Sequence, residues 1–394
     1  MNNHKTFAAE PKLEAEKPAT SISRRVFLAE AAAAIAVGPT LLRASLRESA
    51  EPAILHVATF SSQTGHIHTF APTSDSCRLL GSTAIDAFAA LAAHPALPIL
   101  YVARDCTHWN RLPRGVVETY AVRRHARPLQ LLAQTPMALS ATGPRSLAVS
   151  PCSRHLLVSA STGGAWNSFA LDQDGLPASV AIARKEIGIA QNSPDVLLPA
   201  PYGLAFSPRV LLAAGTDPGS ERLTLLQPSS EGIAVLDRCH APSGLAATQP
   251  VWTADGRYIL AAAGRDASFL LYELTGTQDA GSKAGIQLQH VVPTATPITA
   301  LLAYPAKPAV CTSRTQGSGS VLEIWEIQGN HLQRTDSNRL PDQILALTHD
   351  GNSLWAASDD CLVQISMRDL RKSAFEIRLP GDGVRAIVSH NLAL

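Results

Sequence analysis

The stretch Leu147-Ala-Val-Ser-Pro151, followed by the apolar run Leu156-Leu-Val158, is a clear copy of a phrase that recurs along the chain. Each copy places an apolar and a small residue before a polar turn and a β-rich run. Other copies start at Leu91, Leu204, Pro250, Leu301, Leu345 and Ala386. With Leu147 included, successive copies are 56, 57, 46, 51, 44 and 41 residues apart. A period of this length without helical patterning is typical of propeller blades.

The two ends of the repeat region complement each other. Segments 53–59 and 65–70 have the pattern of middle strands, but no inner strand precedes them. Segment 384–389 has the pattern of an inner strand with no strands after it. If the ends share one blade, the ring closes and exposed sheet edges are avoided. We therefore predict an all-β, seven-bladed β-propeller over residues 51–394, closed by N- and C-terminal strands that share one blade.

Residues 1–50 form a separate leader. They contain Ser23-Arg24-Arg25-Val26-Phe27-Leu28, followed by an apolar run from Ala31 to Leu42. An arginine pair before a modest apolar run is typical of twin-arginine signals, which direct proteins across the bacterial inner membrane. We therefore predict a periplasmic or exported protein. The cleavage site stays open, so the leader is either removed or kept as a membrane anchor, and we predict no other membrane contact.

The composition excludes several classes of partner. The net charge is +1 and only 16% of the residues are charged, so the chain lacks the basic surface that nucleic-acid binding needs. Its six cysteines form no Cys-x-x-Cys pair, and His66-x-His68 has no third ligand in the sequence. No phosphate loop, nucleophile elbow or dinucleotide fingerprint is present. We predict a monomer with no metal and no organic cofactor.

Several segments match a known family. They are Leu55-His-Val-Ala-Thr-Phe60, the phrase from Leu91 to Pro95, Gly163-Gly164 and, best of all, Asp217-Pro-Gly219-Ser-Glu221-Arg222. Through them, residues 53–394 resemble the bacterial lactonase family of seven-bladed propellers. That family includes propeller-type 6-phosphogluconolactonases and is related to carboxymuconate cycloisomerases. The resemblance implies the propeller fold and the hydrolysis of a sugar lactone.

The chain departs from this family where chemistry is expected. The family's Pro-His-x-His at blade four is Pro201-Tyr202-Gly203-Leu204 here, and its Gly-Pro-Arg-His at blade five is Ala246-Ala247-Thr248-Gln249. Blade three does contain Gly143-Pro144-Arg145-Ser146. Two functions therefore stay open: a sugar-lactone hydrolase, and a non-catalytic propeller that binds a small anion or a protein partner. A cycloisomerase is a third alternative.

The residue two positions before each phrase enters the inner strand near one mouth of the central channel. This ring is Ala89, Arg145, Tyr202, Thr248, Thr299, Gln343 and, allowing one residue of misalignment, Arg385. Arginines beside a tyrosine and a glutamine suit a small carboxylate or phosphate, held by bidentate hydrogen bonds. In the alternative, these strand starts are simply polar and solvated. We predict channel-mouth binding by Tyr202, Gln249, Gln343 and Arg385.

Lactone hydrolysis needs a base that activates water and a donor that stabilises the oxyanion. We predict Arg145 or Arg385 as the oxyanion donor, with Asp217 or Glu221 as the base. The same two carboxylates also fit a structural role, in which Asp217 caps a tight turn and Glu221 pairs with Arg222. Asp105 and His108, in the loop 104–114, form a further polar cluster that is either solvated or functional.

Overall fold

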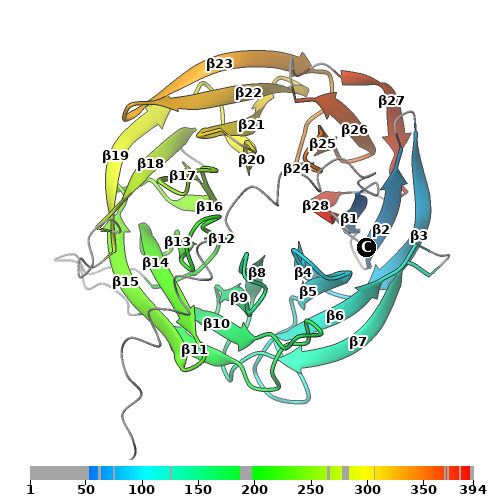
Figure 1. Ribbon diagram of the computed structural model, residues 1–394, viewed down its shortest axis with the longest axis vertical. Coiled ribbons are helices and arrows are strands. Elements are labelled where there is room, and N and C mark those ends of the chain that lie inside the picture. The colour runs from blue at the N-terminus through cyan, green and yellow to red at the C-terminus, as the bar shows by residue number, and fades with distance from the viewer. Residues whose placement is uncertain are drawn as a thin grey trace, which may run out of the picture. The chain divides into compact units, whose positions relative to one another are not determined.

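Seven four-stranded antiparallel sheets form a ring in the computed structural model (Figure 1). The structure describes residues 53–60, 64–73, 76–124, 127–186, 198–263, 267–276, 284–305, 307–367, 370, 372–380 and 383–390. Within these ranges there is no helix. The predicted all-β, seven-bladed propeller is therefore confirmed.

The strands of each blade are given from the innermost to the outermost, starting with the first four blades. Blade one contains β28 (Val384–His390), β1 (Ile54–Phe60), β2 (Gly65–Pro72) and β3 (Cys77–Ile85). Blade two contains β4 (Phe88–Ala93), β5 (Ile99–Arg104), β6 (Val116–Val122) and β7 (Leu129–Pro136). Blade three contains β8 (Pro144–Val149), β9 (His155–Ala160), β10 (Ala165–Ala170) and β11 (Ile182–Lys185). Blade four contains β12 (Leu204–Phe206), β13 (Ala213–Asp217), β14 (Arg222–Ser229) and β15 (Gly232–His240).

The remaining three blades complete the ring. Blade five contains β16 (Ala247–Trp252), β17 (Tyr258–Ala263), β18 (Ser268–Thr275) and β19 (Gly285–Pro293). Blade six contains β20 (Ile298–Ala303), β21 (Ala309–Gln316), β22 (Gly319–Gln328) and β23 (His331–Leu340). Blade seven contains β24 (Ala346–His349), β25 (Ser353–Ala357), β26 (Cys361–Ser366) and β27 (Lys372–Arg378).

The ring closes in blade one, where strands from the two ends of the chain pair. β28 is hydrogen-bonded to β1 in an antiparallel ladder that sets Val57 opposite Ile387 (Figure 1). β28 is thus the inner strand of a sheet whose other three strands come from the start of the repeat region. The predicted closure by terminal strands that share one blade is confirmed.

Burial explains why these sequences form strands. The second strand of a blade packs between neighbouring blades, so β9 is buried at every residue and reads as a continuous run, His155-Leu-Leu-Val-Ser-Ala160. The outer strand is less buried, and in β7 four of the eight residues are exposed. Between blades six and seven, Leu322 and Ile324 share one apolar cluster with Leu354 and Val363. The hydrophobic core thus lies between the blades.

The predicted polar turns join the inner strands to the second strands. Gly256 has a φ of +70°, in the left-handed region that favours glycine, and its N–H donates to the Thr253 carbonyl at 2.8 Å. The Asp255 carboxylate accepts a hydrogen bond from the Arg257 N–H at 3.1 Å, which holds the turn that links β16 to β17. The polar turn predicted after the inner strand is therefore present in blade five.

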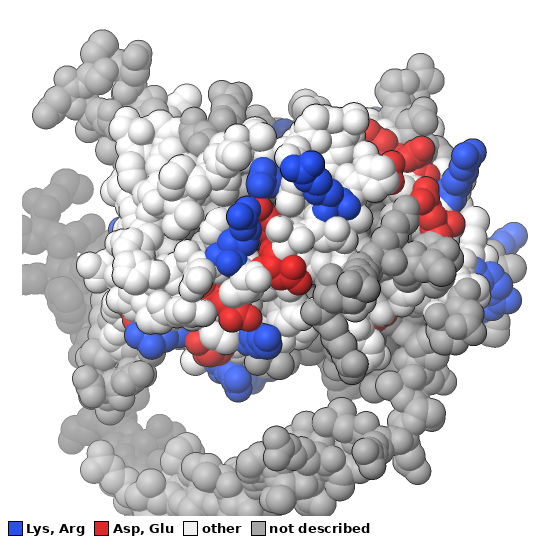
Figure 2. All heavy atoms as spheres, turned by 90° about the horizontal axis from the view of Figure 1, so that it is seen from above, with Lys and Arg blue, Asp and Glu red and all other residues white. Residues whose placement is uncertain are grey.

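Charged side chains of both signs share the face of the propeller seen in Figure 2. Lys and Arg side chains lie beside Asp and Glu side chains there, with uncharged surface around them. Ion pairs within one blade also occur among the described residues, such as Lys307 with Glu326 at 3.4 Å. On this face, opposite charges are interspersed and do not form a field of one sign.

The leader lies outside the described residues. The twin-arginine motif at Arg24 and Arg25 and the apolar run after it belong to residues 1–50, so the export signal and the boundary at residue 50 stay predictions. In the described part of the chain, no helix has the length and apolar character to cross a membrane.

Candidate functional site

The inner strands carry a β-bulge at the same place in five blades. In blade three, Pro144 pairs with Ala160 and Ser146 pairs with Ser159, which leaves Arg145 as an extra residue. The same irregularity falls on one residue in four other blades: Ala89, Thr248, Thr299 and Arg385. A bulge redirects a side chain out of the regular pleat. In these five blades, the repeat therefore places one residue of the inner strand outside the regular ladder.

These bulge residues line a cavity of about 770 Å³ at the centre of the ring. All seven blades contribute residues to it. Among the described residues, its charged lining consists of Arg145, Arg385 and Asp105, and its walls also include Leu91, Leu147 and Phe88. A concave site of this size with a few polar groups on an apolar wall suits a small molecule. The excess of positive charge favours an anionic or oxygen-rich one.

Arg145 and Asp105 form an ion pair on the wall of this cavity. The Arg145 Nη1 lies 3.3 Å from Asp105 Oδ2, and Arg145 Nε donates to Ser161 Oγ at 3.1 Å. Both side chains are partly open, with exposed fractions of 39% and 38%. The Nη2 of Arg145 has no hydrogen-bond partner among the described residues, so this guanidinium is held on two sides and offers its remaining donors to the cavity.

Three further polar side chains stand around the same cavity. Arg385 is exposed there and makes no hydrogen bond or ion pair with any described residue. Tyr202 is 40% exposed, and Gln249 uses its Nε2 to donate to the Leu301 carbonyl at 3.2 Å. The structure thus brings Arg145, Tyr202, Gln249 and Arg385 together around one space. Their role in binding stays a prediction.

The close packing of blade four against blade five requires a glycine at position 203. A Cβ atom at this position would lie 2.2 Å from the Thr248 carbonyl oxygen and 2.4 Å from Pro250 Cδ. Only glycine permits such a close approach of the inner strands of blades four and five. Gly203 therefore lets the chain next to Tyr202 lie close to blade five, where both line the cavity.

Gln343 is not among the cavity-lining residues of the described chain, in contrast to the placement predicted for it. Its Nε2 donates to Thr315 Oγ1 at 3.4 Å. The equivalent residue of blade seven is Leu345, whose N–H donates to the Ala357 carbonyl at 2.8 Å, as the Tyr202 N–H does to Thr216. In blade seven, the repeated phrase therefore starts at Leu347 and not at Leu345. The channel-mouth residue of this blade is the apolar Leu345 instead of Gln343.

Asp217 and Glu221 are not brought together with Arg145. Neither is among the described residues that line the cavity. Asp217 is fully buried, its Oδ1 accepts hydrogen bonds from the Ala200 and Ser220 N–H groups, and its Oδ2 lies 3.3 Å from Arg222 Nη2. Burial raises the pKa of Asp217. Glu221 accepts a hydrogen bond from the Gly244 N–H at 2.9 Å. The contacts of Asp217 correspond to the structural alternative, in which this carboxylate caps the turn 217–222. Glu221 contacts Gly244, whereas that alternative pairs it with Arg222.

The carboxylate that the structure does place beside Arg145 is Asp105. It directly follows β5, at the end of the strand that returns to the cavity mouth, and its N–H donates to the Ala87 carbonyl. His108, the other member of the predicted polar cluster, is exposed and is not among the described lining residues. The position of Asp105 at the end of a second strand was the signal that could have singled it out.

Solved structures share this architecture. A candidate 6-phosphogluconolactonase from Bacteroides uniformis matches with a TM-score of 0.69 at 15% identity, over 86% of this chain and 99% of that chain. A second candidate 6-phosphogluconolactonase, from Bacteroides fragilis, matches with a TM-score of 0.69 at 13% identity, over 86% and 98%. The periplasmic gluconolactonase of Pseudomonas aeruginosa matches with a TM-score of 0.65 at 13% identity, over 86% and 99%.

The fold is that of the lactonase propellers. The resemblance inferred from the repeat phrases is therefore confirmed for the fold. No protein-family model matches the sequence, and a search of curated proteins gives no match. At 13–15% identity the likeness establishes the architecture, and the chemistry has to be argued from the residues of this chain.

Proposed function

We propose that the protein binds a small sugar lactone in the central cavity and hydrolyses it to the open-chain acid. The observation that carries this proposal is the Arg145–Asp105 pair on the cavity wall, with Arg385 on the same lining. It combines a carboxylate that can take a proton from water with cations that stabilise an oxyanion. The shared fold with a periplasmic gluconolactonase supports the substrate class.

The chemistry divides between the charged residues. Asp105 accepts a proton from a water molecule, and the water oxygen forms a bond to the lactone carbonyl carbon. Arg145 donates to the oxyanion that develops on the carbonyl oxygen, since its Nη2 has no other partner among the described residues. The bond from the carbonyl carbon to the ring oxygen then breaks, and the ring oxygen takes up the proton. Arg385 suits the carboxylate of the product.

A second function is favoured by the charge of the same lining. Two arginines face one aspartate, and that aspartate already contacts Arg145. A cavity with this balance can hold a small carboxylate without turning it over. In this alternative the protein is a binding module, and the family's missing histidines at blades four and five account for the absence of catalysis.

The place of action follows from the leader. The twin-arginine motif supports export, and one protein of the same fold is periplasmic. We therefore propose that the lactone or its acid is met in the cell envelope. A phosphorylated lactone made inside the cell fits this place less well than an unphosphorylated one.

The test is turnover of glucono-δ-lactone by the purified full chain, followed by acid release at constant pH and compared with spontaneous opening. We expect a rate above the background and a loss of about 100-fold in kcat/KM for Arg145→Ala, the size that follows removal of an oxyanion donor. The matched control is Arg257→Ala, which removes an arginine that pairs with Glu273 on the surface of blade five.

The outcomes separate the two functions. Gluconate binding measured by calorimetry, together with no rate above the background, would replace the hydrolase by the binding module. Absence of both turnover and binding would overturn both.

A further inference from the structure

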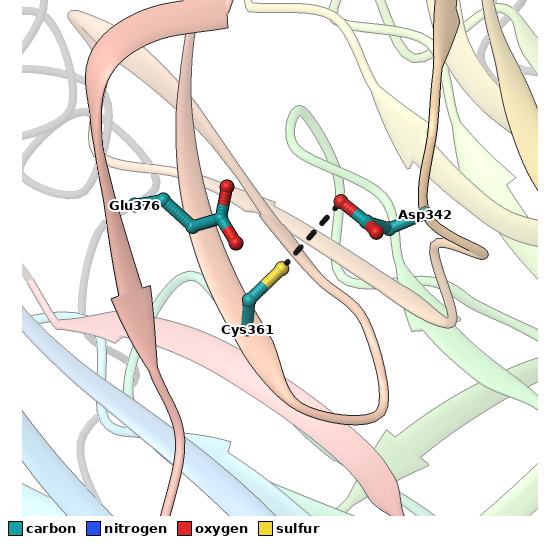
Figure 3. A group of neighbouring side chains, drawn as sticks. All are labelled: Asp342, Cys361 and Glu376. Atoms are coloured by element: carbon teal, nitrogen blue, oxygen red, sulfur yellow. Dashed lines mark hydrogen bonds between the residues drawn. The ribbon is translucent and has the colours of Figure 1, made fainter.

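Three metal-ligating side chains converge on blade seven, outside the cavity. Asp342 lies in the connection from β23 to β24, Cys361 begins β26 and Glu376 lies in β27 (Figure 3). One ligand atom from each lies within 4.8 Å of the other two. The Cys361 Sγ donates to Asp342 Oδ2 at 3.8 Å, and Figure 3 shows the Glu376 carboxylate turned toward the same sulfur. Two oxygens and one sulfur therefore point into one small space.

Strand pairing produces this convergence. In the ladder between β26 and β27, Cys361 stands opposite Arg378 and Val363 stands opposite Glu376. Cys361 and Glu376 are thus diagonal neighbours on one face of the sheet. Asp342 comes from the chain segment that crosses from blade six to blade seven, which places its carboxylate over the same face.

Negative groups gather around this thiol. The only hydrogen bond that the Asp342 carboxylate receives from the described residues comes from the Cys361 thiol, a weak donor. The Ser358 hydroxyl lies 2.9 Å from the sulfur and also contacts Asp360 Oδ1 at 3.2 Å. A cation would satisfy the Asp342 oxygens that the thiol cannot.

We propose that Asp342, Cys361 and Glu376 bind one zinc ion. Thiolate and carboxylate together suit Zn²⁺, since Mg²⁺ and Ca²⁺ take oxygen ligands and Cu⁺ prefers sulfur. Zinc bonds of about 2.3 Å to sulfur and about 2.1 Å to oxygen, at a tetrahedral angle, set the two ligand atoms about 3.6 Å apart. The Cys361 Sγ and Asp342 Oδ2 are 3.8 Å apart, so they need little movement. Ser358 or a water molecule completes the fourth position.

The proposed site departs from the prediction of no metal. The sequence does not reveal it because its ligands come from three separate segments and form no sequence motif. Burial and the neighbouring carboxylates raise the pKa of Cys361 to about 11, so the thiol of the metal-free protein carries its proton at neutral pH. Zinc binding forms the metal–sulfur bond and releases that proton to water. The bound ion would tie the connection between blades six and seven to the outer strand β27.

The test is metal binding by the purified, reduced, tag-free full chain. Equilibrium dialysis against Zn²⁺ should leave one zinc per chain by elemental analysis, and Mg²⁺ at the same concentration should leave none. Co²⁺ in place of zinc should give a thiolate-to-cobalt charge-transfer band in the near ultraviolet. Cys361→Ser should remove that band, and Asp342→Asn or Glu376→Gln should weaken zinc binding at least about tenfold.

The matched control is Cys311→Ser, which changes a buried cysteine of the same apolar cluster and should keep both the zinc and the cobalt band. A second measurement needs no variant: saturating Zn²⁺ should slow alkylation of Cys361 in the wild-type chain at least about tenfold. No stoichiometric zinc, a band that persists in Cys361→Ser, or an unchanged alkylation rate would each overturn the proposal.

Discussion

Arg145 and Asp105 belong to neighbouring blades, and their side chains meet at 3.3 Å on the wall of the central cavity. Arg145 occupies the bulge of β8 in blade three, and Asp105 follows β5 in blade two. Both are more than one third exposed, so the pair contributes at most about 1 kcal/mol to folding. Its effect is therefore expected on a ligand rather than on stability.

Asp105→Asn should separate catalysis from binding. The substitution removes the proposed base, so we expect kcat on glucono-δ-lactone to fall about 100-fold. It also leaves Arg145 without a competing carboxylate, so gluconate should bind several-fold more tightly. Acid release gives kcat and calorimetry gives Kd, with the thermal unfolding midpoint as a check on folding. An unchanged kcat would remove Asp105 from the chemistry.

Arg385 and Gln343 should contribute very differently to gluconate binding, although both are predicted from the sequence to lie near the channel mouth. Arg385 lines the cavity and has no partner among the described residues, whereas Gln343 is bonded to Thr315. Arg385→Ala should weaken gluconate binding about 10- to 100-fold, the range for one hydrogen bond between charged groups. Gln343→Ala should leave Kd unchanged in the same titration. Equal losses in both variants would contradict the assignment of Leu345 as the residue of blade seven.

Ring closure should be sensitive to acid because histidines are buried where β1 and β28 pair. The rings of His56 and His390 are 6.1 Å apart, and His390 Nε2 lies 2.6 Å from the Leu97 carbonyl oxygen, close to His94. Burial and the neighbouring His390 lower the pKa of His56 to about 3. Burial and His94 lower the pKa of His390 to about 4, against the opposite effect of the Leu97 carbonyl.

The sign of the pH effect follows from these depressed pKa values. Below pH 6.5 the unfolded chain binds protons at His56 and His390 while the folded chain does not, so the free energy of unfolding falls as the pH drops toward 4. Each group contributes a slope of up to about 1.4 kcal/mol per pH unit. Urea unfolding between pH 7 and pH 4.5 measures it. His56→Leu should flatten the slope, and His108→Leu, a change at an exposed histidine, should not.

The sequence was sufficient for the architecture because every blade repeats the same register of apolar residues. It predicted seven blades and the blade that the two ends of the chain share. The same period of two caused the error in blade seven. Leu345 and Leu347 both fit an alternating pattern, and a slip of two residues leaves that alternation intact.

Contacts between blades could not be found in this way. Asp105 and Arg145 are 40 residues apart, and only the ring brings the end of β5 beside the bulge of β8. Asp342, Cys361 and Glu376 likewise meet through a ladder and a connection between blades. Asp217 and Glu221 belong to a family motif that forms a turn here. The Asp217 carboxylate is buried and accepts hydrogen bonds from the Ala200 and Ser220 N–H groups.

A buried ion network joins blade three to blade four. Glu186, which follows β11, has a side chain with no exposed surface. It accepts hydrogen bonds from Trp166 Nε1 at 2.8 Å, Arg222 Nη2 at 2.7 Å and Arg238 Nη2 at 3.0 Å. Two guanidinium groups thus contact one carboxylate that water does not reach.

Glu186→Gln should therefore destabilise the propeller far more than a matching substitution in an exposed ion pair. The glutamine keeps the shape but removes the charge that pairs with Arg222 at 2.7 Å, and the side chain of Arg222 is only 4% exposed. We expect the free energy of unfolding to fall by about 3–5 kcal/mol, the range for breaking a buried pair. Glu273→Gln, which breaks the exposed pair with Arg257, should lower it by less than about 1 kcal/mol. Urea unfolding of both variants at pH 7 decides the matter, because similar losses would mean that the Glu186 network adds no more than a surface pair.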